Sequence, residues 1–393
     1  MRTKVPMTAQ ITEAVAGIRR AGSVATDPAT IADELHAALV QDGLRLVLVF
    51  VSADHDLDAL GPALQDRFGP VPVVGCTTAG EITPLGYLRG ATCGISFAGP
   101  HFSAAVRTIE TLETVNLNRG HELVRSAIQE LVRSSPAATR ERMFAITLID
   151  GLSGLEEGVV SALHAALGEI PLSGGSAGDS LRFQRTSVLA GGRFRSDAAL
   201  LILIATDHPF RVFKTEHFVA GTEKTVVTEA DPARRIVTEI NAEPAAREYA
   251  RLVGMEIDEL TPMIFATHPV VVRVGGQNFV RSIQKVNEDE SLTFFCAIDE
   301  GIVLTAAKGV DLLDNLRQTF AAMRADIGPP VAVIGFDCIL RALEMDEKAI
   351  REDVGHLMRD HNVIGFSTFG EQFQAMHVNQ TFAGIAIGRR KDA

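Results

Sequence analysis

Three histidines have surroundings that suit a metal-binding imidazole. His217 is flanked by aromatic residues, His268 precedes a proline at the start of an apolar segment, and His377 lies on an expected strand near the end of the chain. A neutral imidazole in an apolar cleft can hold a metal and leave one coordination position open to a small molecule. No HxH, HxxxH or HExxH spacing is present, so a metal site formed by protein ligands alone is weakly indicated. The alternative for each is a hydrogen-bonded structural histidine.

A second set of polar residues belongs to a short Gly-rich phrase that occurs three times, at 75–81, 173–179 and 365–371. Glycine allows a positive φ or a close backbone approach, and hydroxyl and acidic side chains next to it cap neighbouring amides. At the ends of strands the same groups could instead line a ligand cleft. Together with two strand-end aspartates, the candidate cleft residues are Thr78, Glu81, Asp150, Ser176, Asp179, Asp337, Thr368 and Glu371.

The copy at 174–178 also fits the G-x-S-x-G pattern of a hydrolase nucleophile. That motif requires a helix directly after the serine, whereas residues 181–186 alternate as a strand would. In the alignment of the three copies, Thr78 and Thr368 occupy the position of Ser176, so the turn forms without a serine. The chain has neither a P-loop nor a GxGxxG fingerprint, and these nucleotide-binding devices therefore have no support.

Each copy of the phrase follows the same succession of an apolar run, an amphipathic helix and a second apolar run. Such internal repetition is typical of a fold that reuses one unit. We therefore predict an α/β protein with mixed sheets, flanking helices, repeated strand–helix–strand units and two related domains. The expected helices of the units are 56–68, 155–167 and 346–358.

The remaining patterns predict the domain organisation. Residues 1–30 read as an N-terminal arm with a helix over 8–21, followed by domains 31–225 and 226–393. Asp231 followed by Pro232 is typical of a helix start and predicts a helix ending near residue 240. Further expected elements are helices 244–253 and 311–324, a strand pair 270–274 with 279–285, and a strand pair 292–298 with 302–306.

Composition excludes several classes of function. The chain of 393 residues has a net charge of −12, no Trp and two Tyr, with no basic stripe for nucleic acid. No apolar run approaches the roughly 20 residues that span a bilayer. The four cysteines are scattered, which favours buried thiols in a reducing cytoplasm over a disulfide framework or a zinc site.

Two segments of the chain resemble the signatures of FIST proteins: the first Gly-rich phrase, 75–81, and residues 379–384. That family combines an N-terminal and a C-terminal FIST domain and is proposed to sense small ligands in bacterial signal transduction. The resemblance covers nearly the whole chain. Four segments are similar to the NosP branch of the family: 171–181, 231–250, 335–338 with Arg341, and 365–381.

The resemblance to NosP implies a haem-based nitric-oxide sensor without enzymatic activity. Such a protein binds haem b and regulates a partner histidine kinase or a cyclic-di-GMP enzyme (a diguanylate cyclase or phosphodiesterase), and so influences biofilm behaviour. One of His217, His268 and His377 would hold the iron, and nitric oxide would weaken that bond. Arg273 or Arg281 could pair with haem propionates, with surface solvation as the alternative. A homodimer or a hetero-complex is the expected assembly, with no nucleic-acid or membrane partner.

Two rival functions are distinct from this expectation. The first is a haem-free FIST sensor of an amino acid or a similar small molecule, in which the acidic groups of the turns and strand ends read an ammonium group. The second is a hydrolase that uses Ser176 as its nucleophile. The acidic groups that would bind the ammonium are Glu81, Asp150, Asp179, Asp337 and Glu371.

Overall fold

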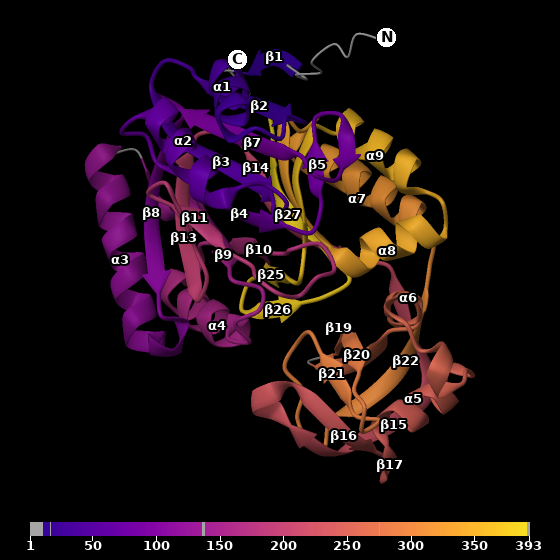
Figure 1. Ribbon diagram of the computed structural model, residues 1–393. Coiled ribbons are helices and arrows are strands. Elements are labelled where there is room, and N and C mark those ends of the chain that lie inside the picture. The colour runs from indigo at the N-terminus through magenta and orange to yellow at the C-terminus, as the bar shows by residue number, and fades with distance from the viewer. Residues whose placement is uncertain (1–10, 16, 136–137, 275, 391–393) are drawn as a thin grey trace.

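The computed structural model describes residues 11–390 apart from 16, 136–137 and 275, and within them one α/β unit occurs three times (Figure 1). Each unit has a first strand, a helix, a parallel β–α–β pair, a short hairpin and a final antiparallel strand. The first unit, preceded by β1 (Ile11–Val15), consists of β2 (Ile18–Ser23), α1 (Pro28–Leu39), β3 (Leu44–Ser52), α2 (Leu57–Phe68), β4 (Val73–Thr78), β5 (Glu81–Thr83), β6 (Gly86–Leu88) and β7 (Thr92–Ala98).

The second and third units repeat this order, which confirms the predicted α/β class with mixed sheets. The second consists of β8 (Phe102–Glu110), α3 (Leu117–Ser134), β9 (Met143–Ile149), α4 (Glu156–Leu167), β10 (Leu172–Ser176), β11 (Val188–Ala190), β12 (Arg193–Arg195) and β13 (Ala198–Thr206). The third consists of β14 (Phe210–Glu216), α7 (Leu312–Ile327), β23 (Ala332–Cys338), α8 (Ile339–Glu347), α9 (Arg351–Asp360), β24 (Val363–Thr368), β25 (Glu371–Phe373), β26 (Met376–Val378) and β27 (Thr381–Ile387).

The three units exchange their hairpins in a ring. Hairpin β11–β12 of the second unit extends the first sheet, which has the order β1-β2-β7-β3-β4-β11-β12. Hairpin β25–β26 of the third unit extends the second sheet, and hairpin β5–β6 of the first unit extends the third. Each sheet therefore pairs the edge of its last parallel strand with a neighbour's hairpin. The new edge is a strand of only 3 residues, and short edge strands limit aggregation.

One apolar core joins the three sheets. The strands of the parallel pairs are buried on both faces, as their near-continuous apolar sequences require. Phe50 stacks on Phe366 with ring centroids 4.8 Å apart, and Phe336 meets Phe50 edge-on. Because these rings come from the first and third units, the units share a core and form a single α/β core domain.

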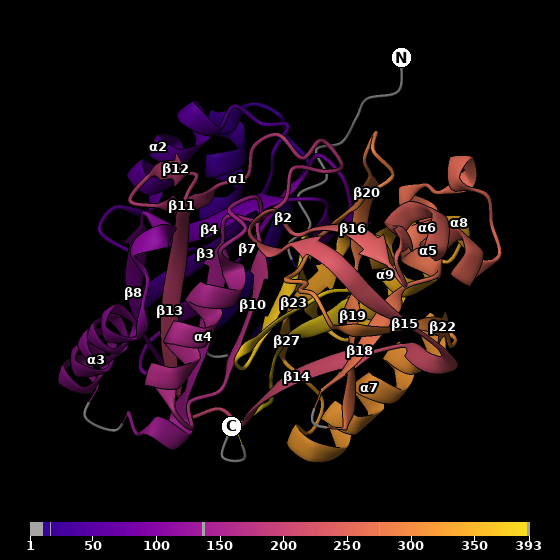
Figure 2. The same ribbon diagram turned by 90° about the horizontal axis from the view of Figure 1, so that it is seen from below.

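A β-rich lobe is inserted into the third unit between β14 and α7 (Figures 1 and 2). Phe373, Met376 and Val378 of hairpin β25–β26 pack into the hydrophobic core of this lobe. The same hairpin therefore completes a core sheet and contacts the lobe. The lobe contains β15 (Phe218–Asp231), β16 (Ile236–Ile240), β17 (Glu243–Pro244), α5 (Ala245–Val253), α6 (Pro262–Thr267), β18 (Val270–Val274), β19 (Gln277–Arg281), β20 (Ile283–Val286), β21 (Leu292–Phe294) and β22 (Val303–Gly309).

The helix expected to begin at Asp231 and Pro232 and to end near residue 240 is wrong, although its start signal works locally. The Asp231 side chain does cap the amide of Arg234, with Pro232 in the first helical position. Arg235 then adopts a left-handed conformation with φ 56°, which ends the structure after one 3-10 turn. The chain continues as β16, because pairing with β15 and β21 replaces helical hydrogen bonds.

Two other local expectations are also wrong. The helix expected over 8–21 is replaced by strands, since β2 pairs with β7 along its whole length; residues 8–10 and 16 lie outside the described residues. Segments 292–298 and 302–306 do not pair with each other, because β21 lies between β16 and β20 while β22 lies between β15 and β18. The expected domain limit at 225 falls inside β15.

The expected strand pair at 270–274 and the helices near 244–253 and 311–324 are confirmed by β18–β19, α5 and α7. All four cysteines are buried and free, as predicted. Within the described part of the chain, no helix combines the length and the apolar character that a bilayer crossing requires.

Candidate functional site

The three Gly-rich turns meet at the centre of the core domain. Gly75, Gly174 and Gly365 occupy equivalent positions, because each lies opposite the first strand of its parallel pair and has no room for a Cβ atom. This register makes Ser176 the counterpart of Thr77 and Ser367. The alignment that matched Ser176 with Thr78 and Thr368 is therefore wrong by one residue.

Backbone hydrogen bonds link each turn to the next. The Ala79 amide donates to the Ser367 carbonyl at 2.9 Å, the Ser176 amide to Gly370 at 2.8 Å, and the Gly178 amide to Thr77 at 3.0 Å. The turns hold the three units together, and the backbone polar groups at this crossing are satisfied by one another.

Glu81 and Glu371 support the crossings rather than face a cleft. The hydroxyls of Thr78 and Thr368 donate to these carboxyl groups, and the amides of Ala91 and Thr381 donate to them at 3.1 and 3.2 Å. Burial raises the pKa of Glu81 to about 7 and that of Glu371 to about 8, against an ordinary value near 4.5.

The three aspartates are engaged in the same way. Asp179 accepts hydrogen bonds from three successive backbone amides, 183–185, at 2.7–2.9 Å. Asp150 accepts from the Asp197 amide at 2.6 Å and from a threonine hydroxyl. Asp337 is fully buried against the guanidinium of Arg341. The expectation that these carboxylates would read a ligand's ammonium group is therefore not met by their geometry.

His217 belongs to a buried ionic network. Its Nδ1 accepts a hydrogen bond from Arg341 at 2.8 Å, and its Nε2 donates to Glu344 at 2.6 Å. Burial, together with the positive charge of Arg341, lowers the pKa of His217, which favours the neutral ring. With both ring nitrogens occupied, His217 has no lone pair for iron in this arrangement.

His268 and the two arginines lie in separate parts of the lobe. His268 follows α6, where its Nδ1 is 2.9 Å from the Thr267 hydroxyl. Arg273 and Arg281 line a hollow of about 730 Å³ on the lobe. His217, His268 and His377 are not among the residues that line this hollow.

His377 lies at the junction between core and lobe, in a cluster of buried polar side chains. We call Gln372, His377, Asn379 and Gln380 the junction cluster; all four are at most 4% exposed. Each has one polar side-chain atom without a hydrogen-bond partner among the described residues: Gln372 Oε1, His377 Nε2, Asn379 Oδ1 and Gln380 Oε1. Leaving a buried polar atom unpaired costs about 1–3 kcal/mol, and such atoms therefore need an explanation.

The partners of the amides fix which atoms are left unpaired. Gln372 Nε2 donates to Ser176 Oγ at 2.8 Å and to the Gly370 carbonyl at 3.3 Å. Asn379 Nδ2 and Gln380 Nε2 donate to the carbonyls of Phe369 and Phe265 at 3.2 and 3.0 Å. Because a carbonyl can only accept, each nitrogen is correctly placed, and the unpaired atoms of the three amides are acceptors.

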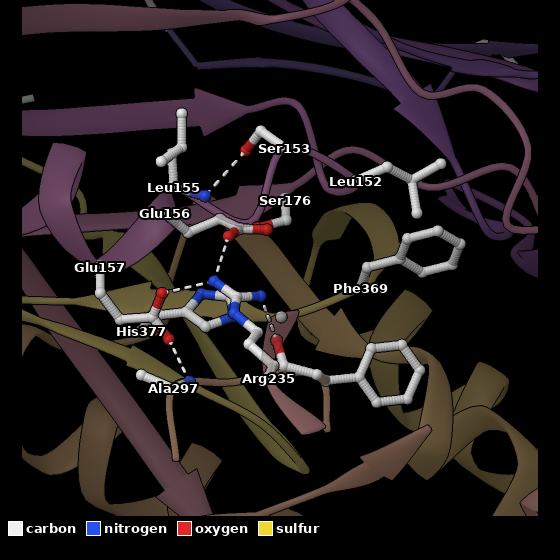
Figure 3. Close-up of polar contacts among 12 residues, drawn as sticks. Leu152, Ser153, Leu155, Glu156, Glu157, Ser176, Arg235, Ala297, Phe369 and His377 are labelled. Atoms are coloured by element: carbon white, nitrogen blue, oxygen red, sulfur yellow. Dashed lines mark hydrogen bonds and ion pairs between the residues drawn. The ribbon is translucent and has the colours of Figure 1, made fainter. Parts of the chain in front are cut away.

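An arginine from the lobe closes the junction beside His377 (Figure 3). Arg235 binds Glu156 and Glu157, in the first turn of α4, at 2.6 and 2.5 Å, and also the Phe295 carbonyl. Glu157 in turn accepts from the Ala297 amide at 2.7 Å. Burial is the main cause of a lowered pKa at His377, and these glutamates oppose it.

The sequence reasoning missed most of these residues. Glu156, Glu157 and Arg235 come from two distant segments, and only folding brings their charges together. Gln372 directly follows the third Gly-rich phrase, and Asn379 and Gln380 lie between β26 and β27. These three amide side chains within nine residues of a largely apolar region were the available signal.

The residues around His377 do not fit a haem group in this arrangement. A Cβ atom added to Gly370 would lie 2.2 Å from Cε1 and 2.5 Å from Nε2 of His377, so the ring is packed against the turn. Within the described residues, no three His, Cys, Asp or Glu side chains are grouped to hold a metal ion. A porphyrin could reach His377 only if the lobe moved away.

Comparisons with known proteins identify the family to which the chain belongs. The FIST N domain matches residues 45–243 and the FIST C domain matches residues 245–374. Among solved structures, two cyanuric acid hydrolases, one of them from A. caulinodans, are similar at 10% and 11% identity, with TM-scores of 0.38 and 0.35. They cover 95% and 94% of this chain and 99% of their own chains. No protein of curated function matches the sequence. Because the two domain matches together span most of its length, the chain belongs to the FIST-domain family of signalling sensors.

Proposed function

We propose that the protein is a sensor in which a small polar ligand binds the junction cluster and changes the contact between core and lobe. The observation that carries this proposal is the set of four buried, unpaired polar atoms on one short hairpin and its continuation. A ligand that pairs with them would recover the free energy that their burial costs.

The cluster favours a ligand that donates several hydrogen bonds and accepts one. The three amide oxygens are acceptors, which suits an ammonium or amide group. Gln372 Nε2 lies 3.2 Å from His377 Nδ1, and when one of its two hydrogens points to Nδ1 the ring proton resides on Nε2, which then donates to the ligand. An amino acid, with its ammonium and carboxylate groups, is the simplest molecule of this kind.

The position of the cluster provides a route for the signal. Hairpin β25–β26 is part of the second core sheet and also of the lobe's hydrophobic core. A ligand between Gln372 and His377 would shift this hairpin and strain the Arg235 contacts to α4. We propose that the resulting change in lobe position is read by a partner signalling enzyme, a histidine kinase or a cyclic-di-GMP enzyme, and that the protein itself acts by binding rather than catalysis.

The test is calorimetric titration of the protein with each common L-amino acid, and with analogues that lack the amine. We expect at least one amino acid to bind and to raise the melting temperature, and its deaminated analogue to bind at least tenfold more weakly. His377→Phe should abolish binding, whereas His356→Phe, on the exposed face of α9, should not. Failure of every amino acid to bind, or equal binding by His377→Phe, would contradict the proposal.

A haem-based nitric-oxide sensor of the NosP type is the second candidate, favoured by the unpaired Nε2 of His377. It requires the lobe to separate from the core, because haem does not fit the closed junction. Protein produced with haem available would then carry a Soret band that shifts with nitric oxide under reducing conditions. His377→Ala should remove this band, while His217→Ala and His268→Ala should retain it. Colourless protein that also rejects added haem excludes this candidate.

A further inference from the structure

The hollow on the lobe differs in character from the rest of this acidic protein. It has a volume of about 730 Å³, within the range typical of small-molecule sites. Three cationic side chains line it, Lys224, Arg273 and Arg281, and no carboxylate does so among the described residues. In a chain of net charge −12, such a local excess of positive charge marks a place that attracts anions.

The cations of the hollow lack an ion-pair partner in the part of the chain that the structure describes. Within the described residues, none of the three forms an ion pair, whereas Arg67, Arg211, Arg235 and Arg251 each pair with a carboxylate elsewhere. The Nε of Arg281 is buried without a partner, and its NH1 reaches only the Val280 carbonyl, at 3.4 Å. Since the Val280 carbonyl is the only acceptor for the Arg281 side chain among the described residues, this guanidinium retains donors for an anion in the hollow.

The remainder of the lining is aliphatic. Val219, Val272, Ile302 and Val303 contribute to it. Val219 and Val303 are 58% and 44% exposed, which places them among the most exposed large apolar side chains of the described residues. Exposed aliphatic side chains gathered around a hollow are typical of a binding surface for an apolar group.

We propose that this hollow binds an amphipathic anion, an alkyl chain that ends in a carboxylate or a phosphate. The alkyl chain would lie against the four aliphatic side chains, and the anionic head would pair with Arg281 and with Arg273 or Lys224. The site is separate from the junction cluster, because no member of that cluster lines it.

The experiment is calorimetric titration with dodecanoate and dodecyl phosphate below their micellar concentrations, with dodecan-1-ol as the uncharged analogue. We expect one anion at a single site, and at least tenfold weaker binding of the alcohol. The stronger of the two anions identifies the head group. Binding should weaken as salt rises, since part of the attraction is electrostatic.

Matched variants locate the site. Arg273→Gln with Arg281→Gln should weaken binding at least tenfold, and Val303→Asp should abolish it. Lys308→Gln, an exposed cation on β22 outside the hollow, should leave it unchanged. Equal binding of the alcohol, no binding of either anion, or an equal loss in Lys308→Gln would overturn the proposal. Retained binding in His377→Phe would separate this site from the proposed sensory site, whatever the outcome there.

Discussion

The centre of the core domain and the junction with the lobe are both rich in buried polar groups. The two regions differ in how completely these groups are hydrogen-bonded. At the centre, Glu81, Asp179 and Glu371 each have their oxygens paired with hydroxyls or amides of the protein. At the junction, every member of the junction cluster keeps one unpaired atom. The repeated motif therefore marks the structural centre, and four unpaired atoms within residues 372–380 mark the candidate site.

The largest expected effect comes from breaking the paired ionic network of the core. Arg341→Met leaves Asp337 buried without its counter-charge and removes a hydrogen bond from His217. We expect a loss of about 3–5 kcal/mol in the free energy of unfolding, measured by urea denaturation. Arg317→Met, at an exposed pair on α7, should cost at most about 1 kcal/mol. Similar losses in both variants would remove the distinction between buried and exposed pairs.

An intermediate effect is expected from the arginine that closes the junction. Arg235→Gln should destabilise the protein by about 2–3 kcal/mol, because Glu156 loses a charged hydrogen bond. Amide hydrogen exchange should quicken in α4 and β21 but not in the central strands β9 and β23. The neighbouring Arg234→Gln, on an exposed side chain, is the control. Uniform acceleration across the core would show that junction and centre are one cooperative unit.

A pH dependence should distinguish the core turns. The pKa of Glu371 is raised to about 8 in the folded protein, so between pH 4.5 and 8 the folded state holds more protons than the unfolded state. The protonated Glu371 carboxyl therefore makes its full contribution to the free energy of unfolding below pH 4.5, and this contribution is lost as the pH rises towards 8. Glu371→Gln should flatten the decline in melting temperature across this range, whereas Glu347→Gln, at an exposed position, should not. An unchanged slope in Glu371→Gln would contradict a buried, protonated carboxyl group.

The smallest effect is expected at the serine that fits the hydrolase pattern. Ser176 Oγ accepts one hydrogen bond from Gln372, so Ser176→Ala should cost about 1 kcal/mol of stability. The turn should still form, because the hydrogen bonds of Ser176 with Gly370 and Phe369 use its backbone amide and carbonyl, which alanine retains. Ester hydrolysis should be measured for the parent protein and for Ser176→Ala. Activity that is present in the parent and lost in the variant would support the hydrolase hypothesis, with Ser176 as its nucleophile.

Local patterns of the sequence predicted the parts of the fold that depend on local chemistry. Each repeated unit was visible because buried parallel strands need apolar runs and the crossings need glycine. The exchange of hairpins could not be predicted from the sequence. No property of residues in β11 or β25 indicates which sheet the hairpin joins. The one-residue shift at Ser176 required the register of β9 with β10.

The candidate site was predicted only in part, through His377. Its amide neighbours became candidates only when their unpaired oxygens could be counted, which requires the positions of Phe369 and Phe265. Arg235 was read as part of a helix, and its role depends on the left-handed turn that directs the chain into β16.

The ring of exchanged hairpins has a consequence for the order in which the protein can fold during synthesis. The first sheet cannot close until residues 188–195 of the second unit have been made, and the second waits for residues 371–378, close to the end of the chain. A nascent chain on the ribosome therefore carries an unfinished edge on the first sheet until residue 195 has been made, and an unfinished edge on the second sheet until residue 378 has been made. Completion of the second sheet is therefore a late event, because it requires one of the last segments to leave the ribosome.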